Sequence, residues 1–255
     1  GVFTAYTVPG TDDLYREWRL VWRRDGAWQV VAQGIAGRDP VNLLAGPDGT
    51  LYLVGWPSGG GTLWYGKPAG GELEMKEEFI RGVAVGNWPY ASAGIDRSGN
   101  LCVLSSLREK PGYFFWAYRQ AQDGRWVSQY TTLPHRYCYT YVFPQGKALS
   151  LVSTRDVRWH VLGYPQRPET FDYVFNAFGY WHTDDIAQPL QGMAFVEEPP
   201  TEQFPNVECR AQNDAYMDTI GRMHILYIRR GASTGGEWQS RHMVLSQEGE
   251  TLYDG

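Results

Sequence analysis

Short hydrophobic segments of β type, joined by glycine turns, recur along the chain. Residues 43–54 contain two such segments around a turn that includes Gly49, and the same pattern returns around Gly99, Gly146 and Gly221. These glycines are separated by 50, 47 and 75 residues. The spacing predicts three regular repeats of about fifty residues and one that carries an insertion of roughly 25 residues.

A second pattern runs half a repeat later, where an aromatic segment leads through a turn into another hydrophobic segment. Residues 18–28 and residues 115–126 show it most clearly, and their turn glycines, Gly26 and Gly124, lie 98 residues apart. Weaker copies occupy residues 63–71, 159–165 and 241–249. Each repeat therefore contains four short predicted strands.

Four strands in each repeat of this length are typical of a β-propeller blade. The chain shows no sustained spacing of the kind that predicts a long amphipathic helix. A β-sandwich, the competing fold, would have strands at 8–12-residue spacing without the longer repeat. We therefore expect an all-β fold, a β-propeller of four-stranded blades with about five blades, forming one domain over residues 1–255.

The phase of the repeat predicts an incomplete first blade. Residues 1–8 align with the second strand of a repeat, and residues 250–253 correspond to an outer strand. The first blade is then either three-stranded in a ring of five, or the chain is a portion of a larger propeller. We expect the insertion to be a long loop at about residues 176–208, which carries a polar, aromatic and proline-rich stretch.

Composition excludes several classes of protein. A net charge of −5 argues against a general nucleic-acid binder. No apolar run approaches the roughly 20 residues that a membrane-spanning helix needs. The three cysteines lie far apart and have no metal-like spacing, so we expect no metal site and no cofactor. The chain does not itself predict an oligomeric state.

The turns of the repeats resemble those of a known family. Asp-x-x-Gly turns occur at Asp96 and Asp218, and Asp-Gly-x-Trp corners occur at Asp25 and Asp123. These are similar to the degenerate repeats of sialidase-like (BNR-type) propellers, which include sialidases, uronate-specific polysaccharide lyases and other glycan-active proteins. The complete Ser-x-Asp-x-Gly-x-Thr-Trp box is absent. The resemblance implies an oligo- or polysaccharide as partner and an extracytoplasmic location, either secreted or periplasmic.

Blade topology predicts which loops share one face, because alternate connections of an up-and-down sheet lie at the same end. The 19 arginines against 4 lysines favour an anionic ligand on that face, since a guanidinium pairs well with a carboxylate; genome composition is the alternative explanation. Exposed aromatic rings there would stack on sugars. The candidate substrate-binding residues are Arg38, Trp88, Tyr90, Arg136, Arg155, Asp156, Trp181, Asp184 and Arg210.

The candidate catalytic residues are His135, Tyr137 and His182. His135 and Tyr137 fall two residues apart on one strand face, near Arg136 and Arg155. Uronate β-elimination needs an arginine to neutralise the carboxylate, a base for the C5 proton and a proton donor for the leaving oxygen. His182, beside Asp184, is a candidate base or metal ligand, or part of a surface cluster.

Hydrolysis stays open beside elimination, because it needs two carboxyl groups roughly 5–9.5 Å apart and the predicted loops carry several acids. The sequence thus predicts a carbohydrate-active enzyme that degrades an acidic glycan by elimination or hydrolysis on one face of the propeller. The alternative is a non-catalytic, lectin-like module. Such a module would repeat its binding residues in every blade, and the loops of these repeats differ from one another.

Overall fold

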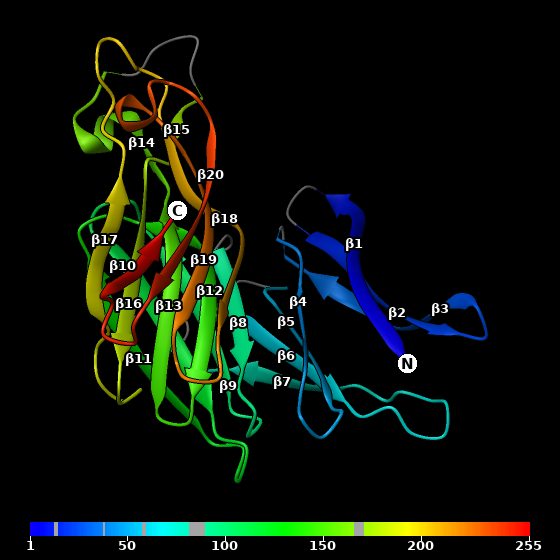
Figure 1. The fold of residues 1–255 in the computed structure, drawn as a ribbon. Coiled ribbons are helices and arrows are strands. Elements are labelled where there is room, and N and C mark those ends of the chain that lie inside the picture. The colour runs from blue at the N-terminus through cyan, green and yellow to red at the C-terminus, as the bar shows by residue number, and fades with distance from the viewer. Residues whose placement is uncertain (13–14, 38, 58–59, 82–89, 166–170) are drawn as a thin grey trace. The chain divides into compact units, whose positions relative to one another are not determined.

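The computed structural model describes residues 1–12, 15–37, 39–57, 60–81, 90–165 and 171–255. Within these ranges the regular structure is nearly all β, with two short 3-10 helices (Figure 1). The strands form successive antiparallel sheets in which neighbours along the chain pair side by side. The all-β prediction is confirmed.

The first sheet has three strands, β1 (Val2–Asp12), β2 (Tyr15–Arg24) and β3 (Ala27–Ala36), in that order. The second sheet has four: β4 (Asn42–Ala45), β5 (Leu51–Gly55), β6 (Gly61–Gly66) and β7 (Lys76–Ile80). The three-stranded first sheet and the four-stranded second one agree with the phase of the sequence repeat.

Three more four-stranded sheets follow. The third contains β8 (Tyr90–Ile95), β9 (Leu101–Leu107), β10 (Gly112–Arg119) and β11 (Trp126–Leu133). The fourth contains β12 (Tyr137–Gln145), β13 (Ala148–Arg155), β16 (Ala177–Thr183) and β17 (Gln191–Glu197). The fifth contains β18 (Glu208–Met217), β19 (Met223–Arg230), β20 (Gln239–Leu245) and β21 (Thr251–Asp254). Up-and-down sheets of this size are propeller blades.

The repeated glycines occupy the turn between the first and second strands of each four-stranded sheet. Gly49, Gly99, Gly146 and Gly221 have φ angles of 84°, 85°, 61° and 85°. Side chains disfavour this left-handed region, so glycine is favoured there. Asp96 completes one such turn by accepting hydrogen bonds from the backbone N–H groups of Ser98 and Asn100, at 2.9 and 2.8 Å. A local conformational need thus accounts for the fifty-residue pattern.

The insertion lies in a different place from the one predicted. The expected long loop at residues 176–208 contains strands β16 and β17, which are paired in the sheet. The extra chain is instead β14 (Val157–Arg158), η1 (Trp159–Leu162) and β15 (Tyr173–Val174), between the second and third strands of the fourth sheet. The weak strand pattern at residues 159–165 forms a 3-10 turn, because β13 pairs with β16 and leaves these residues outside the sheet.

The chain divides into two compact units, which we describe separately. Unit 1 contains residues 1–105, 115–129 and 144–146, and unit 2 contains residues 106–114, 130–143 and 147–255. In unit 2, the fourth and fifth sheets share a core that includes Phe178, Ile225 and Tyr227. A small separate core, built from Val157, Trp159, Val174 and Val207, supports the insertion. A single domain over the whole chain stays a prediction.

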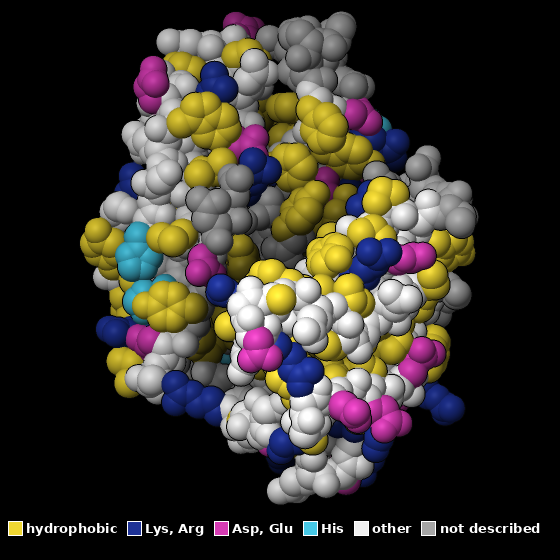
Figure 2. All heavy atoms as spheres, turned by 90° about the vertical axis from the view of Figure 1, so that its right-hand side faces the viewer, with side chains coloured by type: hydrophobic (Ala, Val, Ile, Leu, Met, Phe, Trp, Pro, Cys, Tyr) yellow, Lys and Arg dark blue, Asp and Glu magenta, His cyan; other side chains and the backbone are white. Residues whose placement is uncertain are grey.

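Two further features of the structure are the distribution of charge on one face and the length of the helices. Acidic and basic side chains are interspersed over the face drawn in Figure 2, without a broad basic area. In the part of the chain that the structure describes, neither helix has the length and apolar character to cross a membrane.

Candidate functional site

A cavity of about 490 Å³ opens in unit 2 at the end of the fourth sheet. We call it the Arg155 pocket. Its walls come from the turn before β10, the segment before β12, the ends of β13 and β17, and the insertion. The lining residues are Lys110, His135, Arg155, His160, Val161, Leu162, Gly163, Tyr164 and Glu197. A pocket of this size can hold a small ligand or part of a larger one.

Arg155, the last residue of β13, is held in a fixed position. Its Nε and Nη2 atoms donate hydrogen bonds to Oδ1 of Asn176, at 3.1 and 2.7 Å. Nη2 also pairs with Oε1 of Glu197 at 2.5 Å. The arginine is only 5% exposed, whereas the Glu197 side chain is 42% exposed. The guanidinium is therefore rigid, and its charge is shared with one solvent-facing carboxylate.

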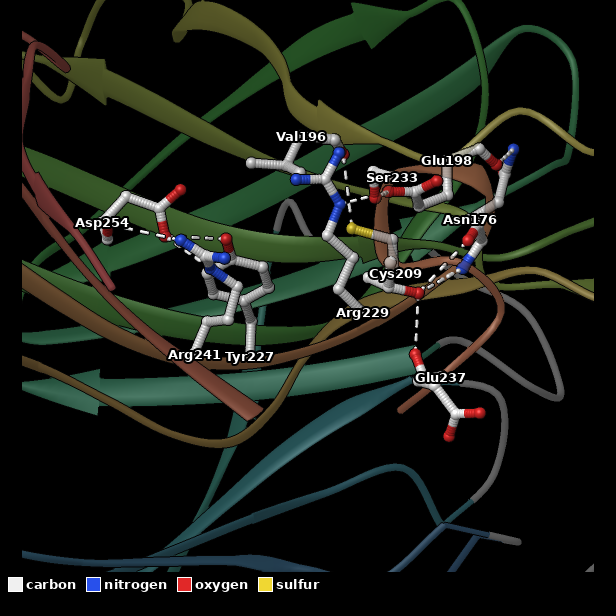
Figure 3. Close-up of polar contacts among 12 residues, drawn as sticks. Asn176, Val196, Glu198, Cys209, Tyr227, Arg229, Ser233, Glu237, Arg241 and Asp254 are labelled. Atoms are coloured by element: carbon white, nitrogen blue, oxygen red, sulfur yellow. Dashed lines mark hydrogen bonds and ion pairs between the residues drawn. The ribbon is translucent and has the colours of Figure 1, made fainter. Parts of the chain in front are cut away.

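Asn176 is itself fixed by a further network of polar groups (Figure 3). Its Nδ2 atom donates to the backbone carbonyl of Glu198 at 3.1 Å. The Glu198 side chain is 1% exposed and accepts hydrogen bonds from Arg229 and Ser233. A buried carboxylate needs such partners, because an unpaired one would be costly. This network ties the position of Arg155 to strand β19 and helix η2 (Ala232–Thr234).

His135 is the most suitable proton acceptor in the pocket. Burial lowers its pKa, the positive charges of Arg155 and Lys110 lower it further, and Glu197 opposes them. The imidazole is therefore neutral at neutral pH and has a free lone pair. Its backbone is also constrained, since a Cβ on Gly112 would lie 2.3 Å from the His135 carbonyl oxygen.

Lys110 supplies a second cation on the pocket wall. Within the described residues, it forms no ion pair with a carboxylate, in contrast to Arg155. An ammonium group of this kind attracts an anionic ligand without first breaking an internal contact. Lys110 is thus the cation of the pocket most available to a bound carboxylate.

Tyr137 and Trp181 lie behind the pocket rather than on its wall. Tyr137 is 3% exposed, and burial raises its pKa to about 12. Its ring packs edge-on against Trp181, with centroids 4.7 Å apart. Trp181 is 2% exposed, so the prediction that it stacks on a sugar is wrong. Its place in β16, paired with Leu151, turns the indole into the core.

Arg136 and Asp156 pair with each other away from the pocket lining. Arg136 donates from Nε to the Asp156 carbonyl at 2.9 Å, and its Nη2 lies 3.3 Å from Asp156 Oδ1. Its guanidinium also lies 5.5 Å from the ring centroid of Tyr173 in β15. These contacts anchor the insertion to the sheet. The structure therefore gives these two predicted ligand-binding residues a scaffolding position.

Two further predicted residues in unit 2, His182 and Asp184, lie away from the Arg155 pocket. Ser150 pairs with His182 near the start of β13, whereas Arg155 ends that strand. The Ser150 Oγ lies 2.9 Å from His182 Nδ1, and Asp184 Oδ1 lies 3.0 Å from His182 Nε2. Ser150 is 2% exposed, so this chain of hydrogen bonds presents no accessible nucleophile. The expectation that His182 and Asp184 share the face of His135 is wrong.

Of the remaining predicted residues, Arg210 and Tyr90 are not among the residues that line the pocket. Arg210 forms an ion pair with Glu208 at 2.8 Å and lies over the ring of Phe175. Tyr90 begins β8 in unit 1. Arg38 and Trp88 lie outside the described residues.

Sequence reasoning missed Lys110, His160 and Glu197. His160 fell in a segment interpreted as a strand, and that interpretation made it structural; η1 instead turns it to the pocket. Glu197 ends β17, which was expected to be part of a loop. A correct assignment of β16 and β17 would have placed the end of β17 at the same edge of the sheet as the end of β13, with β16 between them. In the described part of the chain, no group of three or more metal-ligating side chains gathers at one point.

Comparison with known proteins gives no family. No family model matches the chain, and no curated protein matches it. Solved structures resemble it at low identity. An engineered GH43 glycoside hydrolase with endo-xylanase and exo-arabinofuranosidase activity is 12% identical, with a TM-score of 0.48, over 98% of this chain and 54% of that one. This chain thus spans about half the length of that structure.

Two other resembling structures are similar in length to this chain. The α-L-arabinanase of Cellvibrio cellulosa, complexed with arabinohexaose, is 9% identical over 97% of this chain and 93% of its own, with a TM-score of 0.45. The GH43 endo-arabinanase of Bacillus licheniformis is 10% identical over 98% and 92%, also with a TM-score of 0.45. Likeness at this level carries no information about activity. The resemblance to sialidase-like propellers stays a prediction.

Proposed function

We propose that this protein is a carbohydrate-active enzyme that cleaves an acidic glycan by β-elimination in the Arg155 pocket. The observation that carries the proposal is the presence of His135, with its lowered pKa, in one cavity with the cationic side chains of Lys110 and Arg155. A neutral base next to two cations suits a substrate that carries a carboxylate beside an acidic C–H bond. The resemblance of the turns to sialidase-like propellers, which include uronate lyases, supports a uronate.

The proposed reaction uses these groups in a defined order. Lys110, assisted by Arg155, holds the uronate carboxylate and stabilises the charge that develops when C5 loses its proton. His135 accepts that proton, and the C–H electrons form a double bond between C4 and C5. The C4–O4 bond breaks, and the leaving oxygen takes a proton from His160 or from a water molecule. His135 then returns its proton to solvent, and His160, where it was the donor, takes a proton back from solvent.

Hydrolysis is less well supported by the same cavity. A glycosidase of the usual kind needs two carboxyl groups, one as acid and the other as base or nucleophile. In the described lining, Glu197 is the single carboxylate, and it is paired with Arg155. Elimination needs no second carboxyl group, so it accounts for the residues present.

A panel of glycans tests the proposal. Uronate-containing, sialylated and neutral polysaccharides are incubated with the protein, and both unsaturated product, by ultraviolet absorbance, and new reducing ends are measured. We expect unsaturated product from a uronate glycan, and its loss in His135→Gln. His242→Gln, a change in strand β20, is the matched control and should leave the rate unchanged.

Each other result overturns the elimination mechanism in a different way. Reducing ends without absorbance would indicate hydrolysis. Binding of a glycan without turnover would indicate a lectin-like module. Absence of both binding and turnover on every acidic glycan would contradict the proposed substrate class.

A further inference from the structure

A second, smaller cavity adjoins the Arg155 pocket. It has a volume of about 190 Å³ and lies between the insertion and the chain segment that leads into β18. We call it the proline slot. Its lining residues are Trp159, Tyr164, Pro165, Pro200, Thr201, Glu202 and Pro205. We propose that the proline slot binds a neutral sugar ring that neighbours the acidic sugar in the Arg155 pocket, an inference that rests on the proposed function.

The aromatic wall of the slot is fixed before any ligand binds. The Trp159 indole donates from Nε1 to the Phe171 carbonyl at 2.7 Å. The backbone N–H of Tyr164 donates to the Trp159 carbonyl at 3.2 Å, and the two rings meet edge to face with centroids 6.4 Å apart. Trp159 also belongs to the small core of the insertion. Its ring therefore cannot rotate away to close the slot.

The opposite wall is also rigid. The Thr201 N–H donates to the Phe204 carbonyl at 3.1 Å, and the Phe204 N–H donates to Thr201 Oγ1 at 3.0 Å. Pro200 and Pro205 flank this turn and restrict its backbone further. A preformed site of this kind loses little conformational entropy when a ligand binds.

Size and polarity select one kind of occupant. An apolar cavity of about 150 Å³ takes benzene, so about 190 Å³ suits a single six-membered ring. The slot offers aromatic and proline surfaces to the apolar C–H face of a sugar, and Thr201 and Glu202 to its hydroxyl groups. Among the described residues of the lining, Glu202 is the one that carries a charge, and it would repel a carboxylate. The ring that fits is therefore neutral.

Continuity between the cavities makes the two rings neighbours. Tyr164 lines both the slot and the Arg155 pocket. Lys110 and Arg155 select an acidic ring on one side of this tyrosine, and Glu202 selects a neutral ring on the other. The recognised unit is then a pair of adjacent sugars, one acidic and one neutral, rather than a run of uronates.

Binding measurements with three probes test this inference. The probes are glucuronic acid, xylobiose, and the disaccharide in which glucuronic acid is linked to xylose, each titrated calorimetrically. We expect the mixed disaccharide to bind about tenfold more tightly than either other probe. The Trp159 indole N–H resonance, assigned as the signal missing from Trp159→Phe, should shift with xylobiose and not with glucuronic acid.

Two variants distinguish binding in the proline slot from binding in the Arg155 pocket. Glu202→Lys, at an exposed position, should increase affinity for a disaccharide of two uronates about tenfold and leave the affinity for glucuronic acid unchanged. Glu237→Lys, another exposed change in unit 2, is the charge-matched control and should alter neither affinity.

The outcomes distinguish the two proposals. Glucuronic acid binding with no gain from the attached xylose would overturn the slot inference and leave the proposed function intact. Binding of xylobiose with no binding of any uronate would overturn the proposed function, and with it the mixed pair. A Trp159 resonance that does not shift with xylobiose would overturn the sugar as the occupant of the proline slot.

Discussion

At the scale of single residues, charged groups that are adjacent in the sequence differ in whether they line the Arg155 pocket. Arg155 lines it, while the next residue, Asp156, points away and pairs with Arg136. His135 lines it, while Arg136 beside it does not. His135 and Arg136 precede β12 and Asp156 follows β13, so strand alternation does not decide which of them lines the pocket. The sequence placed Tyr137 on the same face as His135, but Tyr137 is buried and does not belong to the lining.

The ionisation of His135 sets the pH dependence of the proposed activity. Burial, Arg155 and Lys110 favour its neutral form, so its pKa lies below the ordinary value of about 6.5. The protonated imidazole cannot accept the C5 proton, and activity should fall as the pH drops through this lowered pKa. We expect kcat/KM to show an acid limb below pH ~6.5. An acid limb above that value would contradict the assignment.

The planar guanidinium group of Arg155 should contribute to stability and to uronate binding in addition to its charge. Arg155→Lys keeps the positive charge but loses the paired hydrogen bonds to Asn176. The buried Oδ1 atom of Asn176 then lacks hydrogen-bond donors that it has in the native protein. We expect a loss of about 1–3 kcal/mol in the free energy of unfolding by urea, together with weaker uronate binding. Arg125→Lys, at an exposed pair with Asp123, should leave the free energy of unfolding by urea unchanged. An equal change in the free energy of unfolding in the two variants would contradict this role of the Arg155 guanidinium.

At the scale of elements, the insertion supplies residues of both cavities that the four-stranded sheet does not provide. Helix η1 brings His160 to the pocket and Trp159 to the proline slot, and its small core keeps it beside the sheet. The sequence showed that about 25 extra residues had to be present, but it did not show where. Residues 177–183 are aromatic and polar like a loop, and only pairing with β13 shows that they form a strand.

The start of β10 controls the position of His135. A Cβ on Gly112 would lie 2.3 Å from the His135 carbonyl oxygen and 2.7 Å from the Arg136 nitrogen, so the backbone must move. We expect Gly112→Ala to cost about 1–3 kcal/mol in urea unfolding and to reduce uronate binding by displacing His135. Gly46→Ala is the control, since its Cβ would first meet side-chain atoms of Tyr52 and Asp48, which can adjust. Unchanged stability of Gly112→Ala would show that the two segments lie further apart.

At the scale of the whole molecule, the sheets bury every cysteine. Cys102, Cys138 and Cys209 are buried free thiols. Burial raises the pKa of each, in the case of Cys209 to about 12. Thiolate is the reactive form, so these groups are inert in the folded protein. Their place in the sheet cores explains their spacing, which suited neither a metal nor a disulfide framework.

Thiol labelling follows from this burial. The native protein should react with an aromatic disulfide reagent only at the rate of unfolding, and all three thiols should react rapidly in guanidinium chloride. A reductant should leave the melting temperature unchanged. Rapid labelling of one thiol in the native state would show that one of the cores is open to solvent.

The sequence by itself determined the repeating sheets, because their signals are local. A left-handed turn needs glycine at positions such as Gly99, and a half-buried strand needs alternating side chains. The tertiary structure alone decided the pocket. Lys110, His160 and Glu197 come from three separate segments, and their meeting depends on strand register and on the path of the insertion. Register is set by long-range pairing, such as Leu151 with Trp181, which no local pattern of residues encodes.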